Sequence, residues 1–273
     1  MTNATFKWLA AAVLAAALLV YGLLRTWGPR TTAPGPSAGA GKELQVFCAV
    51  SLRSPLEELA REYEQEYGTK INLQFGGSGT LLATIATTGH GDLYLPADGG
   101  YIAKAKEKNL AGEVMDLAIM KPVLAVAKGN PKAVKGWADV LYRRELKVGL
   151  CNPDLAAIGA VVQAVAKERG EWEALEAVSD VTKTTVAELA VDLKAGALDA
   201  TFLWDQMVAE TGDLDTLPCP ELAGHEANVP AVVLKCSAAA DDSLRFAKWI
   251  ASAEHGAPVF LKHHFTPAAQ PAH

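Results

Sequence analysis

Two stretches of the chain decide the fold: Leu44-Gln-Val-Phe-Cys-Ala-Val-Ser51 and Phe75-Gly-Gly-Ser-Gly-Thr-Leu81. Each joins the end of an apolar, strand-like run to the start of a helical pattern, and each places a serine at the junction. The first helix is expected to start at Ser54-Pro55-Leu56-Glu57, where a serine cap, a proline and a capping-box glutamate occur together. Gly68 is expected to end it, and a second helix is expected over 80–88.

The positions of the two serines, Ser51 and Ser78, indicate an anion site. The first N–H groups of a helix have no partner within the helix, and the helix dipole makes that end positive. Glycines beside Ser78 let a ligand approach the backbone. A Gly-Gly-Ser-Gly loop alone is usually a tight strand-to-helix turn. Two such junctions in one short stretch favour the functional interpretation, an oxyanion held without a counter-cation.

The composition of the chain limits the size of its core and the classes of ligand that it can bind. The chain has 273 residues, half of them hydrophobic, which is enough to bury one large core or two lobes. Its formal net charge of −6 argues against a nucleic-acid binder, which would show a basic stripe. The charge does not argue against anion binding, because neutral N–H and O–H donors can hold an anion without a positive side chain.

The N-terminal part of the chain predicts export. Residues 8–24 form an uncharged apolar run long enough to cross a membrane. A cleavage site is conceivable after residues 38–40, although these lie unusually far from the run. We therefore expect residues 1–28 to stay as a membrane anchor. Residues 29–42 are rich in proline, glycine and small side chains, and they are expected to act as a linker.

From residue 44 onward, apolar strand patterns alternate with helical ones, which predicts an α/β fold with largely parallel sheets. No P-loop, dinucleotide fingerprint or Gly-x-Ser-x-Gly elbow occurs, and the histidines show no metal-ligand spacing. We therefore expect no cofactor and no enzyme activity. An exported hydrolase that uses Ser51 or Ser78 as its nucleophile is the alternative from another class, but no histidine motif supplies the base.

Three motifs follow one another in a characteristic order: Cys48-Ala-Val-Ser-Leu52, Phe75-Gly-Gly-Ser-Gly-Thr-Leu81 and Gly91-Asp-Leu-Tyr-Leu-Pro-Ala-Asp98. They resemble the signature of the periplasmic molybdate-binding proteins of ABC transporters, within the class II substrate-binding proteins. The resemblance covers about residues 44–267 and is strongest at 47–98. Thinner matches lie at Asn152–Gly159, Thr185-Val186, Asp199–Asp205 and Phe246–Pro267.

The resemblance implies a set of ligand-binding residues. Ser51 and Ser78 would hold molybdate, a metal oxyanion, through their hydroxyl and local N–H groups. Ile158 and Val186 would contribute only backbone N–H groups. Trp204 stands where the family has a tyrosine, and its indole N–H can donate but not accept. A fully deprotonated oxyanion needs only donors, so tryptophan is chemically suitable there, although a core role for Trp204 is an open alternative.

Leu203 bears on the geometry of the anion. Some relatives have a glutamate at this position and complete an expanded coordination sphere with carboxylates, which a leucine cannot do. The resemblance therefore implies a tetrahedral, hydrogen-bonded anion.

The resemblance also implies a two-lobed class II periplasmic binding protein fold with the ligand in the cleft between the lobes. Residues 43–119 and 237–273 would form the first lobe, and residues 120–236 the second. The expected function is to capture molybdate, or tungstate, outside the cytoplasm and to deliver it to an ABC permease. The protein would be a monomer, periplasmic or otherwise extracytoplasmic, and attached to the cytoplasmic membrane by residues 8–24. Alternatives are a binder of another small oxyanion such as sulfate, or a membrane-anchored sensor domain.

The chain has four cysteines, and an exported domain permits disulfides. Cys219 and Cys236 flank the end of the expected second lobe and are the favoured pair. Cys48 and Cys151 each end a strand beside a proposed ligand loop. They are expected to lie on opposite lobes as buried thiols, because a bond between them would lock the cleft.

Overall fold

The computed structural model describes residues 42–268. The chain divides into Met1–Ala40 and a compact unit from Gly41 onward. The predicted anchor, residues 1–28, and nearly all of the predicted linker, residues 29–42, therefore lie outside the described residues. Within residues 42–268, no helix is long and apolar enough to cross a membrane.

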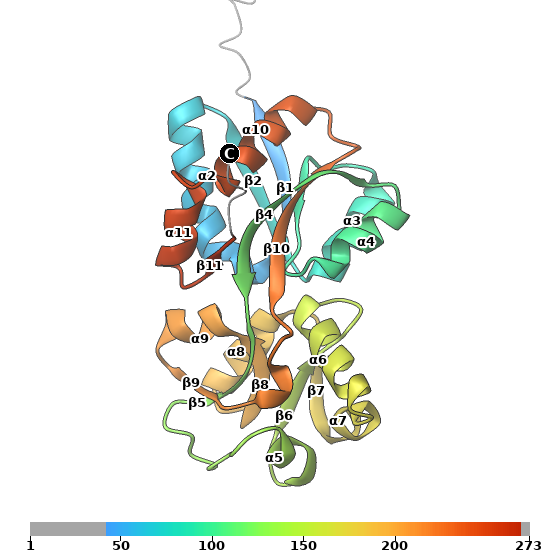
Figure 1. Ribbon diagram of the computed structural model, residues 1–273, viewed down its shortest axis with the longest axis vertical. Coiled ribbons are helices and arrows are strands. Elements are labelled where there is room, and N and C mark those ends of the chain that lie inside the picture. The colour runs from blue at the N-terminus through green and yellow to red at the C-terminus, as the bar shows by residue number, and fades with distance from the viewer. Residues whose placement is uncertain (1–41, 269–273) are drawn as a thin grey trace, which may run out of the picture. The chain divides into compact units, whose positions relative to one another are not determined.

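Two β-sheets form the framework of the compact unit (Figure 1). The first contains, in spatial order, β11 (Thr266–Pro267), β4 (Ala111–Met120), β10 (Ala227–Leu234), β3 (Leu93–Leu95), β1 (Glu43–Ala49) and β2 (Lys70–Gly76). The second contains β7 (Ser179–Lys183), β6 (Val148–Cys151), β8 (Ala200–Trp204), β5 (Pro122–Ala127) and β9 (Leu214–Leu217). Each sheet with its helices forms one lobe, so the predicted two-lobed α/β architecture is confirmed.

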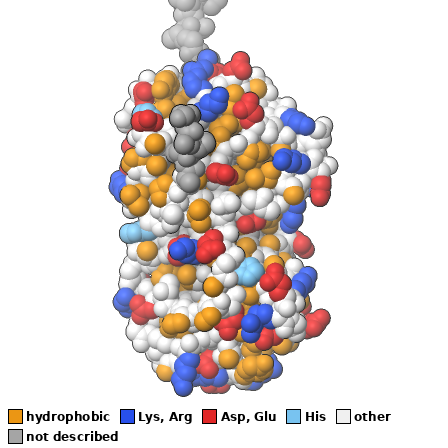
Figure 2. Space-filling model, in the orientation of Figure 1, with side chains coloured by type: hydrophobic (Ala, Val, Ile, Leu, Met, Phe, Trp, Pro, Cys, Tyr) orange, Lys and Arg blue, Asp and Glu red, His pale blue; other side chains and the backbone are white. Residues whose placement is uncertain are grey.

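Helices cover both sheets. The first lobe carries α2 (Arg53–Tyr67), α3 (Ser78–Thr88), α4 (Gly100–Glu107), α10 (Ala240–Ala251) and α11 (Gly256–Lys262). The second carries α5 (Trp137–Tyr142), α6 (Ala157–Glu168), α7 (Trp172–Val178), α8 (Val186–Lys194) and α9 (Asp205–Thr211). Two short 3₁₀ helices are η1 (Val50–Leu52) and η2 (Pro220–Leu222). On the face drawn in Figure 2, acidic and basic side chains are interspersed.

The sheets are mixed rather than largely parallel, which corrects the sequence prediction. In the first sheet β1 pairs in parallel with β2 and β3, whereas β10 runs antiparallel to β3 and β4. The reason is the route of the chain: it leaves the first lobe through β4 and returns through β10, so these neighbours point in opposite directions (Figure 1).

The same route corrects one predicted boundary. Residues 227–234 were assigned with the second lobe, but they pair with β3 and β4 in the first sheet. Their burial is nearly complete, as expected for a central strand with neighbours on both sides. Val229–Leu234 is an apolar run in the sequence, and such a run does not reveal which sheet its strand joins.

Helix α2 shows why its residues form a helix and where the prediction of its start was wrong. Leu56, Leu59, Ala60 and Tyr63 recur at helical spacing and are buried. The helix ends at Gly68, whose φ of 66° suits a residue without a side chain. Its start lies at Arg53, directly after η1, and no side chain caps it. Ser54 therefore does not act as the predicted cap, because the 3₁₀ turn already continues into the helix.

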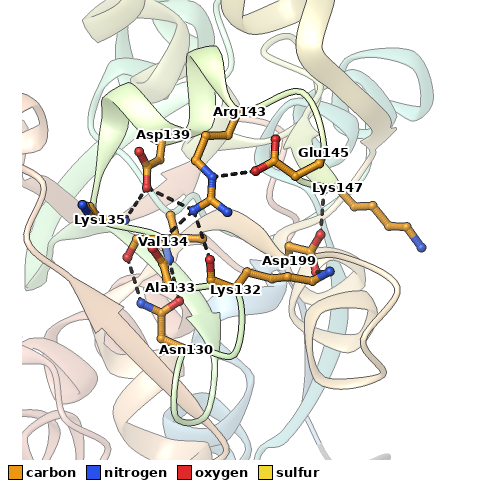
Figure 3. Close-up of polar contacts among 10 residues, drawn as sticks. All are labelled: Asn130, Lys132, Ala133, Val134, Lys135, Asp139, Arg143, Glu145, Lys147 and Asp199. Carbon is orange, nitrogen blue, oxygen red and sulfur yellow. Dashed lines mark hydrogen bonds and ion pairs between the residues drawn. The ribbon is translucent and has the colours of Figure 1, made fainter.

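A long connection joins β5 and β6 in the second lobe, and Arg143 makes several polar contacts within it (Figure 3). The Arg143 guanidinium donates to Glu145 at 2.8 Å and to the carbonyl of Lys132 at 3.0 Å. It also contacts the Asp139 carboxylate at 3.3 Å. The bond to Glu145, followed by that to Asp139, raises the pKa of Arg143. Charge-assisted bonds to one planar group thus join Lys132, Asp139 and Glu145 within the connection.

All four cysteines are free, so the favoured Cys219–Cys236 disulfide is absent and that prediction is wrong for this structure. Cys48 and Cys151 are buried thiols, as predicted. Burial raises the pKa of Cys151 to about 12 and that of Cys48 further still. Because the thiolate is the reactive form, both side chains are chemically inert here.

Candidate functional site

A small pocket lies where the first lobe meets the second. Its lining comes from the first lobe through Ala49, Val50, Ser51, Gly76, Gly77, Ser78 and Ala97, and from the second through Ala156, Ala157, Ile158, Val186 and Trp204. All the residues predicted as ligand contacts are therefore brought together. The cavity is small: the centre of a water-sized molecule can move within only about 10 Å³ of it. Its size therefore suits a ligand of a few heavy atoms.

The pocket is surrounded by the N-terminal ends of helices. Ser51 lies in η1, which runs into α2, and Ser78 is the first residue of α3. Ile158 is the second residue of α6, and Val186 is the first residue of α8. The first N–H groups of a helix have no acceptor within it, and their positive dipole ends favour an anion. The strand-to-helix junctions of both lobes thus present donors to one small space.

Ser51 supplies the strongest indication of a ligand-binding role. Its hydroxyl oxygen is buried and has no hydrogen-bond partner among the described residues. A buried hydroxyl without a partner is unfavourable, because it has lost its bonds to water. In this pocket the hydroxyl is free to donate to a bound acceptor.

Ser78 is fixed by its neighbours. Its hydroxyl oxygen accepts a hydrogen bond from the Ala97 N–H at 3.1 Å. Its carbonyl oxygen accepts one from the Tyr94 hydroxyl at 2.8 Å. Since the hydroxyl acts only as an acceptor in these contacts, its own hydrogen remains available for a ligand.

Trp204 combines the two roles that the sequence left open. It ends β8, where it pairs with Pro122 of β5, and only 1% of it is exposed. It is therefore a core residue, yet it also lines the pocket. Among the described residues, none accepts a hydrogen bond from its indole N–H in the structure. The indole can consequently donate to a ligand without breaking an existing bond.

The described residues that line the pocket include no charged side chain. Asp92, Asp98 and Asp205 lie outside the lining and bind backbone instead. They accept hydrogen bonds from the N–H groups of Gln45, Gly100 and Lys121 respectively, at 2.8, 2.7 and 2.9 Å. Burial raises the pKa of Asp98, and the Gly100 N–H partly opposes this effect. The three carboxylates therefore hold backbone segments outside the pocket lining.

The pocket offers no general base for catalysis, since its lining within the described chain contains no histidine and no carboxylate. Residues 42–268 also contain no group of three or more His, Cys, Asp or Glu side chains placed to hold a metal ion. What the arrangement can do chemically is bind: it offers neutral donors from several directions to one small acceptor.

Two contacts between the lobes were not foreseen. The Gly79 N–H donates to the carbonyl oxygen of Leu155 at 2.9 Å, and the Gln206 amide donates to the carbonyl oxygen of Ser51 at 3.4 Å. The side-chain oxygen of Gln206 is buried and has no hydrogen-bond partner among the described residues. The glycines around Ser78 were a signal of close approach, but the sequence suggested a ligand rather than the other lobe. Nothing in the sequence pattern distinguished Gln206.

The chain resembles known binding proteins in sequence and structure. It is 32% identical over 146 residues to the molybdate-binding protein ModA of Mycobacterium tuberculosis, which covers 52% of this chain and 55% of that protein. It is 26% identical over 180 residues to a putative binding protein of Haemophilus influenzae, covering 66% of this chain and 73% of that protein. The chain thus spans about half the length of the molybdate-binding relative.

Among solved structures, the Azotobacter vinelandii periplasmic molybdate-binding protein superposes with a TM-score of 0.69 at 21% identity, covering 83% of this chain and all of that one. This likeness shows the fold, a two-lobed class II periplasmic binding protein. The family model of the bacterial extracellular solute-binding proteins matches residues 44–266, nearly the whole described part. The chain therefore belongs to the bacterial extracellular solute-binding protein family.

Proposed function

We propose that this chain captures a tetrahedral oxyanion, molybdate or tungstate, and delivers it to an ABC permease. The observation that carries the proposal is the pocket between the lobes, where the hydroxyls of Ser51 and Ser78 meet helix N-termini and no charged side chain. Such donors match an anion that is fully deprotonated and offers only acceptor oxygens. The molybdate-binding relatives support the same choice of ligand.

In this proposal each lobe supplies part of the coordination shell. Ser51 and Ser78 donate from the first lobe through hydroxyl and backbone groups. Ile158 and Val186 donate backbone N–H groups from the second lobe, and Trp204 adds its indole N–H. When the lobes close, these fixed donors replace the water around the anion, and a permease would recognise the closed form. No covalent step occurs, so the protein acts as a binder rather than an enzyme.

The proposed location is outside the cytoplasm, with the N-terminal segment, residues 8–24, as a membrane anchor. Membership of an extracellular family supports export. The apolar run in the sequence supports anchoring. A single copy holds all the proposed ligand contacts, which supports a monomer as the working unit.

Sulfate is the competing ligand, because it has the same charge and the same tetrahedral shape. Selection between the anions rests on size, because donors from both lobes surround one small cavity. A titration of the full chain with molybdate, tungstate and sulfate tests the proposal. Preference for sulfate would assign the protein to the alternative, and failure to bind any of the three would overturn the proposal.

A further inference from the structure

The N-terminal end of α3 in the first lobe touches a loop of the second lobe. Besides the hydrogen bond from the Gly79 N–H to the Leu155 oxygen, the Cα atom of Gly79 lies against the carbonyl of Asp154. A Cβ atom added at Gly79 would approach the Asp154 oxygen far closer than 3.0 Å, a separation that real Cβ atoms essentially never show. One added at Gly77 would collide with the Leu155 oxygen and would lie 2.7 Å from the Thr184 oxygen.

These glycines are not needed for the backbone of their own lobe. Gly77 has φ −71° and ψ 144°, an extended conformation open to any residue, and neither Gly77 nor Gly79 has a positive φ. The three nearest atoms that a Cβ would meet, at either position, all belong to the second lobe. The constraint against a side chain therefore comes from the approach of the lobes.

The second-lobe atoms in this contact are directly connected to proposed donors. Asp154 and Leu155 immediately precede Ala156, the N-cap of α6, which carries Ile158. Thr184 immediately precedes Thr185, the N-cap of α8, which carries Val186. If a side chain kept these loops away from α3, the N–H groups of both helices would move away from the serines. Close packing at Gly77 and Gly79 is thus coupled to the assembly of the pocket.

We infer that Gly77 and Gly79 are positioning residues that set how far the cleft closes, with Gly79 the stricter of the two. The inference rests on the proposed function and adds contacts with the opposite lobe to it, made by Gly77 in the pocket lining and by Gly79 outside the lining. With alanine at position 79, the first lobe can still bind the anion in the open form, but the second-lobe donors cannot reach it.

The decisive variant is Gly79→Ala, made in the full chain. Because its closed population falls, its dissociation constant for molybdate should rise about 100-fold, mainly through faster release. Its melting temperature without ligand should match that of the natural chain, since the lobes can part to accept the methyl group. Gly77→Ala is a second variant and should show a smaller loss of affinity for the same reason.

Gly99→Ala is the matched control. Gly99 belongs to the same lobe, lies outside the pocket lining and has φ −63°. A Cβ there would meet only Asn228, at an ordinary 3.9 Å. This variant should bind molybdate as the natural chain does.

Hydrogen exchange distinguishes a closure defect from general damage. In the natural chain, molybdate should slow exchange in the peptide that spans residues 77–80, because the amide of residue 79 is bonded across the cleft. In Gly79→Ala this slowing should be absent, while protection of the buried helix α2 is the same in both chains.

Affinity within about threefold of the natural chain, or ligand-induced protection that survives in Gly79→Ala, would overturn the inference and leave the proposed function intact. A large loss of melting temperature in the ligand-free variants at both glycines would also overturn it, because the collision would then act inside the folded lobe. If the natural chain binds no oxyanion, the proposed function falls and this inference falls with it.

Discussion

At the scale of single residues, Ser51 and Ser78 are held differently although both line the pocket. The Ser51 hydroxyl has no partner among the described residues, whereas the Ser78 hydroxyl accepts a bond from the buried Ala97 N–H. Loss of a hydroxyl therefore has two separable consequences, one for the ligand and one for the fold.

Ser51→Ala and Ser78→Ala should each weaken molybdate binding by about 1.5–3 kcal/mol, the range for a hydrogen bond to a charged group. Ser51→Ala should leave the free energy of unfolding nearly unchanged, because it removes a hydroxyl without a partner. Ser78→Ala should also lower it, by about 1–3 kcal/mol, because the Ala97 N–H loses its acceptor. Calorimetric affinity and denaturant unfolding of the same samples check both effects.

Ser54→Ala serves as the control for the serine variants, because Ser54 lies in the same region and makes no cap bond. It should change neither the free energy of molybdate binding nor the free energy of unfolding by more than about 0.5 kcal/mol. Unchanged affinity in both pocket variants would remove the serines from the site.

Variants of Trp204 can also separate an effect on ligand binding from an effect on the stability of the fold. Trp204→Phe keeps most of the aromatic packing but loses the indole N–H, so molybdate binding should weaken by about 1.5–3 kcal/mol. Trp204→Tyr should recover part of this loss, because the hydroxyl restores a donor. Affinity and melting temperature measured on both variants test the assignment.

Trp137→Phe is the matched control for Trp204, since the Trp137 indole donates to Glu171 at 2.8 Å and lies outside the pocket lining. It should lower stability and leave affinity intact. The same pattern in Trp204→Phe would mean that Trp204 is a core residue only.

At the scale of elements, α2 and α11 are joined through one carboxylate. Glu58 accepts a hydrogen bond from Lys262 at 2.6 Å and lies 2.8 Å from the His263 ring nitrogen. The bond to Lys262, followed by that to His263, lowers the pKa of Glu58 below its ordinary value of 4.5. The other ring nitrogen of His263 lies 3.3 Å from Glu210 of α9, in the second lobe.

The lowered pKa of Glu58 determines whether the stability of the protein rises or falls with pH. A carboxyl group whose pKa is lowered in the folded protein stabilises the fold at pH values above its ordinary pKa. This stabilisation is lost as the pH falls through the lowered pKa. Between about pH 5 and pH 3, the melting temperature of the natural chain should therefore fall more steeply than that of Glu58→Gln. Glu62→Gln, an exposed position in the same helix, should follow the natural chain. Parallel curves for the natural chain and Glu58→Gln would refute this role.

Helix α2 and strand β10 show which features of the elements can be predicted from the sequence. The apolar spacing in α2 and its glycine end were predicted correctly, because periodicity and a left-handed terminus are local properties. The predicted start of α2 and the predicted lobe of β10 were wrong. A 3₁₀ turn that runs into a helix replaces the cap, and strand pairing depends on where the chain returns from the second lobe.

At the scale of the whole molecule, the pocket exists only because the lobes meet. The sequence predicted its contacts through motifs at Ser51 and Ser78 and through thinner matches in the second lobe, and the structure brings these residues together. Contacts that hold the lobes against each other, at Gly79, Gln206 and His263, join residues far apart in the chain. Such pairs leave no periodic pattern, so only the folded structure reveals them.

In the proposed function, neutral donors from both lobes bind a tetrahedral metal oxyanion. Calorimetric titration of the full chain, at neutral pH, with molybdate, tungstate, sulfate and phosphate tests this binding. Molybdate or tungstate should bind well above sulfate, and phosphate should bind poorly, because its protonated oxygen brings a donor into a site of donors. Equal or tighter binding of sulfate, or no binding of any of the four, would show that the pocket is not a molybdate or tungstate site.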